Sequence, residues 1–244
     1  MSLARAIGIV VNGVEGLVVG IEAYLAQGLP GMSIVGLGDT AVGESRDRVR
    51  AAVHNSGLPW PGERKITVGL SPASVHKRGA SLDLGIALAV LAAHEQVPQP
   101  IGVAAVGELA LDGTLQPVRG MLVAALAAQR AGIGRLLVPH TQAREAMLVP
   151  GLDVVGVATL HDAVMVLRGE PLILPALPDD IALAVTPPPD LVDVRGQVEA
   201  RRALEVAAAG GHHLALLGPP GVGKSMLAER LPGLLPPLSD EIGR

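Results

Sequence analysis

A glycine-rich loop near the end of the chain has the residue types and spacing of a nucleotide-binding site. It reads Gly218-Pro219-Pro220-Gly221-Val222-Gly223-Lys224-Ser225, which fits the pattern G-x-x-x-x-G-K-[ST]. In such a loop, glycines let successive backbone N–H groups point inward at phosphate oxygens. The lysine reaches the outer phosphates, and the hydroxyl completes the shell of a nucleotide-bound Mg²⁺ ion. The sequence therefore predicts nucleotide binding, with Mg²⁺ held through Ser225 and the nucleotide.

The segments on either side of this loop predict a strand before it and a helix after it. The apolar run 213–217 reads as a strand leading into the loop, and 225–231 as a helix leaving it, a context that matches the pattern. Only 19 residues follow Ser225. The acidic strand end, the polar sensor and the arginine finger of such ATPases normally lie further along. We therefore expect no catalytic residue in this chain, and no hydrolysis by it alone.

The composition indicates a cytoplasmic protein. Hydrophobic residues make up 49% of the 244 residues, and there is no cysteine, which fits a reducing compartment. The longest apolar runs are far shorter than the ~20 residues that span a bilayer. The N-terminus lacks the apolar stretch of a signal peptide. We expect neither membrane insertion nor disulfides.

Charge and aromatic content give no support to a nucleic-acid partner. The net charge is −4, and all of it comes from residues 169–244, because residues 1–168 carry equal numbers of basic and acidic side chains. Neither part has the basic character typical of nucleic-acid binding. Tyr24 and Trp60 are the only aromatic residues, which argues against a platform for stacking bases.

A proline-rich stretch divides the chain. Residues 169–190 contain six prolines, which are incompatible with a helix interior or a central strand, so the stretch reads as an extended linker. It separates an N-terminal domain, residues 1–168, from a fragment at 191–244.

Residues 1–168 alternate strand-like and helix-like segments, which predicts an α/β (α+β) fold. Asp39 or Thr40 would cap one helix, and Ser81 a second, buried one. Asp112-Gly113 is a hairpin-turn signal. The expected strands are 18–25, 32–35, 66–70, 103–111, 115–118 and 135–138, and the expected helices are 40–55, 82–93 and 120–131.

The C-terminal fragment resembles the start of an AAA+ module of the magnesium-chelatase-like class, and the whole chain resembles the YifB/ComM family. The run 191–239 carries the likeness in the fragment. In residues 1–168 it rests on several strings, among them Gly28-Leu-Pro-Gly31, Ile34-Val-Gly-Leu-Gly-Asp-Thr-Ala41, Glu44-Ser-Arg-Asp-Arg-Val-Arg50, Leu70-Ser-Pro-Ala73, Gly107-Glu-Leu-Ala-Leu-Asp-Gly113 and Pro117-Val-Arg-Gly120.

The resemblance implies a ribosomal-protein-S5-like domain, shared with the Lon protease, fused to the beginning of a P-loop AAA+ ATPase that uses ATP and Mg²⁺. It implies a hexamer in the intact protein and, for the ComM type, a helicase that migrates DNA branches. It also implies that residues around Val194, Gly196 and Gln197 border the adenine ring.

Two other functions stay open. One is a chaperone-like ATPase subunit of the metal-chelatase type. The other is a non-enzymatic role, in which residues 1–168 serve oligomerisation or regulation.

The Lon resemblance raises the question of peptidase activity, which we do not expect. Asp83 stands at the position of the Lon serine, and Leu122 at that of its lysine. Leucine cannot act as a base, and an aspartate cannot be activated as a serine is. Ser81 lies nearby and is interpreted as a helix cap.

Four weaker signals have simpler interpretations. Gly36-Leu-Gly-Asp-Thr-Ala41 matches a dinucleotide fingerprint but lacks the later acidic residue, so a tight strand-to-helix turn is favoured. Arg46, Arg48 and Arg50 read as a solvated helix face with local ion pairs. The Lys77-Arg78 pair is expected in a loop, where contact with nucleic acid is conceivable, but two charges are weak evidence for it. No metal site of the protein itself is expected from the scattered histidines, which are His54, His76, His94, His140, His161, His212 and His213.

Overall fold

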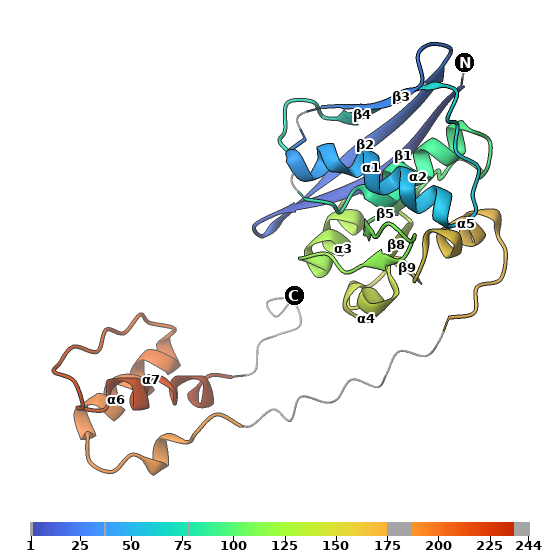
Figure 1. Ribbon diagram of the computed structural model, residues 1–244. Helices are drawn as coiled ribbons and strands as arrows, with labels where there is room; N and C mark the ends of the chain where they lie inside the picture. Colours follow the sequence, from blue (N-terminus) through green and yellow to red (C-terminus); the bar gives the residue numbers. More distant parts are fainter. Residues whose placement is uncertain (1, 37, 78, 175–186, 237–244) are drawn as a thin grey trace. The chain divides into compact units, whose positions relative to one another are not determined.

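The computed structural model describes residues 2–36, 38–77, 79–174 and 187–236 (Figure 1). The chain divides into two compact units, residues 1–177 and 178–244. Each unit is described by itself. Among the described helices, none combines the length and apolar character needed to cross a membrane.

Unit 1 is built on a seven-stranded sheet in the order β3-β4-β2-β1-β5-β8-β9. Four of its six strand pairings are parallel, and the two that involve β2 are antiparallel. A separate two-stranded hairpin pairs β6 with β7. The strands are β1 (Ser2–Asn12), β2 (Glu15–Ala26), β3 (Gly31–Val35), β4 (Lys65–Ser71), β5 (Val103–Ala105), β6 (Glu108–Leu109), β7 (Leu115–Gln116), β8 (Arg135–Pro139) and β9 (Asp153–Val157).

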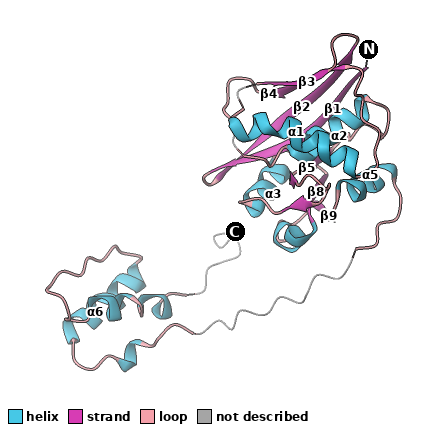
Figure 2. Cartoon of the chain, in the orientation of Figure 1, coloured by secondary structure: helices cyan, strands magenta, loops and turns pink. Residues whose placement is uncertain are grey.

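Helices cover this sheet in two layers (Figure 2). Alternate residues of β1, β5, β8 and β9 point to opposite faces and enter two separate hydrophobic cores. One core includes residues of α1, α2 and α5, and the other includes residues of α3 and α4. The mixed α/β fold expected from the sequence is thereby confirmed. The helices are α1 (Thr40–Asn55), α2 (Asp83–Ala93), α3 (Met121–Arg130), α4 (Ala143–Ala146) and α5 (Leu160–Arg168), with a short 3₁₀ helix η1 (His140–Gln142).

The first strand, β1, was missed by the sequence analysis. It pairs with β2 along its whole length, from Ser2 opposite Leu25 to Asn12 opposite Glu15. Its burial alternates only over part of its length, since Ile9 and Val10 are both buried, one in each core. A strand covered on both faces has no polar alternation to reveal it.

Helix α2 is buried on all sides, as its apolar sequence predicts. All eleven of its residues are buried. Gly85 allows the helix to approach the sheet closely, because a Cβ atom there would lie 2.6 Å from Cδ1 of Ile21. The helix was expected to be capped by Ser81, and this is wrong. The Ser81 hydroxyl donates to the backbone oxygen of Ile9, 3.0 Å away, and so joins the loop to β1.

Two local predictions are confirmed by side-chain contacts. Asp39 caps α1, since its carboxylate accepts from the N–H of Val42 at 3.0 Å. Asp112 and Gly113 form the turn between β6 and β7. The Asp112 carboxylate accepts from the N–H and hydroxyl of Thr114, and these bonds lower the pKa of Asp112.

Unit 2 is small, and the regular elements of its described part are all helices. Its core consists of four buried side chains, Leu191, Val194, Leu204 and Leu227. Other apolar side chains, such as those of Val198 and Leu217, are exposed. The elements are η2 (Leu191–Asp193), α6 (Val198–Gly210), α7 (Lys224–Ala228) and η3 (Leu231–Leu234).

Candidate functional site

The loop of residues 218–225 leads directly into α7. Gly221 and Gly223 have φ angles of +85° and +87°, a left-handed conformation that glycine adopts at little cost. Nothing lies within 4 Å of where a Cβ atom of Gly221 would be, so another molecule can approach the backbone there. Within the described ranges, no acceptor is bonded to the N–H groups of Gly221, Val222 or Gly223.

Lys224 folds back over this loop. Its ammonium donates to the carbonyl oxygens of Gly218 and Pro219, at 2.9 and 2.8 Å. Ser225 follows it at the start of α7 and is exposed. Free backbone donors, a lysine over the loop and an accessible hydroxyl are the groups that phosphates and their Mg²⁺ need. The residues present therefore fit a nucleotide with its metal ion.

The second predicted segment, Val194 to Gln197, meets the loop through one residue. The Gln197 side-chain amide donates to the carbonyl oxygen of Val222 at 2.9 Å. Gly196 and Gln197 are both exposed and both have positive φ angles. Val194, in contrast, is buried in the small core of unit 2, and its carbonyl accepts from Arg201. Of these three residues, Gln197 contacts the loop and Val194 supports the unit from within.

The strand expected at 213–217 does not form, so this prediction is wrong. Residues 212–219 have no regular structure, and Leu217 is 94% exposed. A strand needs a neighbour to bond its N–H and carbonyl groups, and the described part of unit 2 contains no other strand. The helix after the loop is present but shorter than expected, since α7 ends at Ala228.

Asp83, at the position of the Lon serine, is fully buried at the start of α2. Arg48 of α1 donates to both oxygens of its carboxylate, from Nε at 2.7 Å and from Nη2 at 3.1 Å. The Ser45 hydroxyl and the N–H of Leu109 also donate to it. The carboxylate raises the pKa of the Arg48 guanidinium. Each oxygen of Asp83 thus has two donors, and the residue ties together α1, α2 and β6.

This cluster of Ser45, Arg48 and Asp83 corrects one interpretation of α1. Arg48 does not belong to a solvated face, because only 18% of its side chain is exposed. Arg46 does form a local ion pair, at 3.2 Å from Asp47, and Arg50 is exposed. The sequence signal for the cluster was an aspartate opening an otherwise apolar helix. Leu122, at the position of the Lon lysine, lies in α3 and packs against the second core.

Lys77 lies in the connection between β4 and α2, as expected, but its side chain is not available to nucleic acid. Its side chain is buried, and its ammonium donates to the carbonyl oxygens of Gly36, Leu70 and Pro72. Burial lowers the pKa of this ammonium. Arg78 lies outside the described residues.

The glycine-rich turn between β3 and α1 packs closely against its neighbours. A Cβ atom at Gly36 would lie 2.2 Å from the carbonyl oxygen of Leu70, and one at Gly38 would lie 2.5 Å from Val42. Glycine is required here for close packing of the turn, as the sequence analysis favoured.

Across the described ranges, no group of three His, Asp or Glu side chains is arranged to hold a metal ion.

The chain matches two family models of the magnesium chelatase. The family described as "Subunit ChlI of Mg-chelatase" matches residues 21–142, and the family described as "Magnesium chelatase, subunit ChlI" matches residues 190–242. The two matches fall on the two sides of the proline-rich stretch.

Similarity to individual proteins extends over nearly the whole chain. An uncharacterized protein of Mycobacterium tuberculosis is 51% identical over 244 residues, which cover 98% of this chain and 48% of that protein. The uncharacterized protein YifB of Salmonella typhimurium is 44% identical, over 99% of this chain and 47% of that protein. The competence protein ComM of Haemophilus influenzae is 42% identical, over 98% and 48%. The chain spans about half the length of these relatives.

A weaker similarity concerns the fold. A Lon protease of Mycolicibacterium smegmatis is 31% identical over 166 residues, which cover 64% of this chain and 21% of the protease. Together with the mostly parallel sheet of unit 1, this identifies the fold as Lon-like, followed by the start of an AAA+ module. On the evidence of both family models and of relatives that match it from end to end, the chain belongs to the magnesium-chelatase-like YifB/ComM family.

Proposed function

We propose that this chain is the N-terminal domain and nucleotide-binding segment of an ATP-driven motor that acts on branched DNA. The observation that carries the proposal is the loop of residues 218–225, where three free N–H groups, Lys224 and Ser225 lie together. The competence protein among the relatives favours DNA as the substrate. In this proposal residues 1–168 form the Lon-like domain, 169–190 a linker, and 191–244 the beginning of the ATPase.

The residues of the loop have separate roles in this proposal. The N–H groups of Gly221, Val222 and Gly223 hold phosphate oxygens, Lys224 neutralises the outer phosphates, and Ser225 binds the Mg²⁺ ion. Pro219 and Pro220 restrict the loop backbone between Gly218 and Gly221. Gln197 fixes the loop through Val222 and, with Gly196 and Val194, borders the adenine. The bound ATP supplies the free energy for moving DNA.

We further propose a hexamer in the cytoplasm. The hexamer is what the resemblance to the YifB/ComM family implies, and the absence of cysteine fits a reducing compartment.

Nucleotide binding can be tested on this chain directly. A fluorescent ATP analogue with Mg²⁺ is expected to bind the wild-type chain, and Lys224→Ala is expected to weaken binding at least about tenfold, because a charged contact to phosphate is lost. Lys65→Ala is the matched control, since Lys65 is an exposed lysine of unit 1. Equal binding by the Lys224→Ala chain would contradict the assignment of the loop.

The DNA motor requires a protein of the length of its relatives. Such a protein is expected to migrate a branched DNA in the presence of ATP, and the Lys224→Ala variant is not. The absence of both branch migration and DNA-stimulated ATP hydrolysis would rule out the motor.

A second candidate is a chelatase-type ATPase subunit, favoured by the match of both units to the magnesium chelatase family. It predicts ATP hydrolysis that DNA does not stimulate and that depends on a metal-binding partner subunit.

A third candidate is a regulatory or oligomerisation role for unit 1, favoured by Asp83, whose oxygens are all engaged within the fold. A strictly monomeric unit 1 that binds no partner would count against it.

A further inference from the structure

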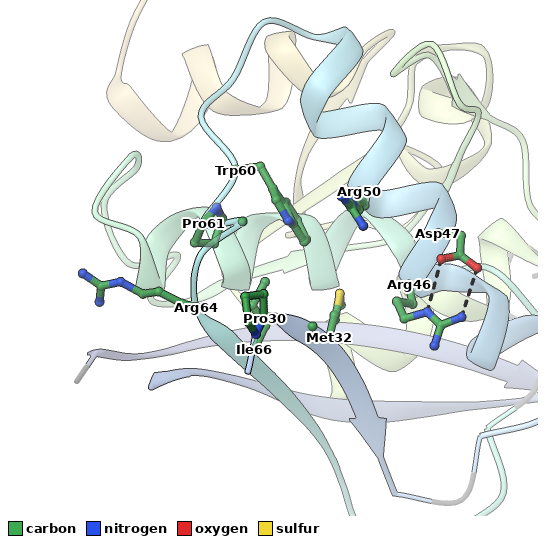
Figure 3. A pocket seen from close by; sticks show the side chains of 11 residues that line it. Pro30, Met32, Arg46, Asp47, Arg50, Trp60, Pro61, Arg64 and Ile66 are labelled. Atoms are coloured by element: carbon green, nitrogen blue, oxygen red, sulfur yellow. Dashed lines mark hydrogen bonds and ion pairs between the residues drawn. The ribbon is translucent and has the colours of Figure 1, made fainter. Parts of the chain in front are cut away.

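Unit 1 contains a pocket that is lined by the only tryptophan of the chain and by three arginines (Figure 3). The pocket has a volume of about 300 Å³. It is formed where the start of β3, the middle of α1 and the connection before β4 meet, and it is distant in sequence from the nucleotide loop. Its principal lining side chains are Met32, Arg46, Asp47, Arg50, Trp60 and Arg64.

Trp60 is placed to contact a ligand as well as the core. Its side chain is partly buried against the first hydrophobic core, which is otherwise almost entirely aliphatic. The same residue also lines a second cavity, of about 350 Å³, together with Arg50 and His54. No hydrogen bond joins its indole nitrogen to another described residue. An indole with open space beside it offers a flat surface on which an aromatic ring can stack.

The charge of this pocket is unbalanced. It is lined by three arginines and one carboxylate, Asp47, a net charge of +2 in a chain whose net charge is −4. Arg46 is paired with Asp47. The guanidinium groups of Arg50 and Arg64, both on exposed residues, form no ion pair within the described ranges. Two cationic groups are therefore available for an anion.

The arrangement of the indole and the arginines matches a polymer in which flat rings alternate with negative charges. In the view of Figure 3, the indole lies between Arg50 on the helix and Arg64, whose side chain extends away from the other residues. A single strand of nucleic acid presents flat bases alternating with phosphates. Base stacking on an aromatic side chain and phosphate pairing with arginine are the two contacts that bind single strands without regard to sequence. An acidic peptide would use the arginines but would leave the indole without a stacking partner.

We propose that the Trp60 pocket binds single-stranded nucleic acid, with one base stacked on Trp60 and the neighbouring phosphates paired with Arg50 and Arg64. The choice of nucleic acid over other anions rests on the proposed function, because a motor that migrates branches must hold separated strands. The pocket was not expected from composition, since one tryptophan does not make a platform until arginines from distant segments surround it.

Trp60 provides its own probe, because it is the single tryptophan of the chain. Titration of the 244-residue chain with a short oligothymidylate, without ATP, is expected to quench the tryptophan fluorescence in a saturable manner. An abasic oligomer with the same number of phosphates is expected to bind at least about fivefold more weakly, since base stacking is lost. Equal affinity for the abasic oligomer would overturn the stacking assignment. Equal quenching by polyglutamate would show instead an acidic-peptide site.

Variants separate the contributions to binding. Arg50→Gln, an exposed change, is expected to weaken binding about tenfold and to lower the salt slope by about 0.7, which corresponds to one phosphate contact. Asp47→Asn is expected to strengthen binding, because it removes the carboxylate and frees Arg46. Arg130→Gln, an exposed arginine at the end of α3, is the matched control and is expected to change nothing. If Arg50→Gln and Arg130→Gln behaved alike, the pocket would not be the binding site.

Trp60→Leu is tested with a fluorescently labelled oligomer and is expected to weaken binding about fivefold or more. Circular dichroism shows whether this partly buried change affects folding, and Arg50→Gln keeps the proposal testable if it does.

Failure of the Trp60 pocket and failure of the proposed motor can be distinguished. A protein that migrates DNA with an unaltered rate after Arg50→Gln refutes the pocket alone. A chain that binds oligothymidylate through Trp60 without any motor activity refutes the motor alone.

Discussion

Lys77 in unit 1 and Lys224 in unit 2 both donate to backbone carbonyl oxygens, but in opposite environments. The Lys77 ammonium is buried and joins three segments, through Gly36, Leu70 and Pro72. The Lys224 ammonium bonds only carbonyls of its own loop, beside N–H groups that have no partner among the described residues. The first lysine closes a turn within a core, and the second lies over a loop that is open to solvent.

The carboxylate of Asp83 extends this contrast. Its four donors come from within unit 1, so no part of it is left for a substrate. Buried polar groups that satisfy one another specify a fold, whereas groups left unpaired at a surface are available to a ligand. By this criterion Asp83, at the position of the Lon serine, is structural, whereas the loop of residues 218–225 has groups that a ligand could bind.

The largest effect is expected from Asp83→Ala. The change leaves the Arg48 guanidinium, the Ser45 hydroxyl and the Leu109 N–H without their acceptor in the interior, which costs about 3–5 kcal/mol of the free energy of unfolding. Urea denaturation of the purified chain measures it. A loss below about 1 kcal/mol would mean that the cluster does not support the fold. The double variant Asp83→Leu with Arg48→Met is expected to recover part of the loss, because it removes both charges.

A smaller loss is expected from Lys77→Met. Methionine keeps most of the length and apolar volume of the side chain but cannot donate to the three carbonyl oxygens. Leaving buried acceptors unsatisfied costs about 1–3 kcal/mol, again measured by urea denaturation. A variant as stable as the wild type would show that these carbonyls find other donors, and that the comparison between the two lysines fails on the side of unit 1.

The pH dependence of the same pair gives an independent check. Burial lowers the pKa of Lys77 in the folded chain, whereas in the unfolded chain the pKa is near the ordinary value of about 10.4. Between these two values the unfolded state binds more protons at Lys77, so its contribution to the free energy of unfolding rises with pH. The stability of the wild type relative to Lys77→Met is therefore expected to increase from neutral to alkaline pH. A decrease would mean that the buried ammonium is favoured over the neutral amine.

Periodicity and short motifs predicted much of the fold but little of this internal chemistry. The strands at 18–25, 32–35 and 66–70 and the Asp39 cap follow from local sequence, and the structure confirms them. The environments of Arg48 and Lys77 depend on residues 35 and 41 positions away, Asp83 and Gly36, which no local pattern connects. The loop at 218–225 was predictable because its contacts are local, whereas the strand before it failed for lack of a pairing partner.

Asp153→Ala tests whether burial, rather than membership of unit 1, determines these effects. Asp153 pairs with Arg135 at 2.6 Å, a distance close to the 2.7 Å between Arg48 and Asp83. The two side chains are 53% and 46% exposed, so water replaces the lost contact, and the cost is expected to be below about 1 kcal/mol. A loss as large as that of Asp83→Ala would show that the ion-pair distance matters more than its environment.

The smallest effect on stability is expected from Lys224→Ala. The carbonyl oxygens of Gly218 and Pro219 are exposed, so water can replace the ammonium, and the free energy of unfolding should change by less than about 0.5 kcal/mol. Adding ATP and Mg²⁺ should stabilise the wild type, by about 2.7 kcal/mol at a concentration of 100 times Kd, and should stabilise the variant much less. Thermal unfolding with and without nucleotide measures both quantities. If Lys224→Ala instead destabilised the chain as much as Lys77→Met does, the loop lysine would be a structural residue too, and the distinction between a closed and an open site would be lost.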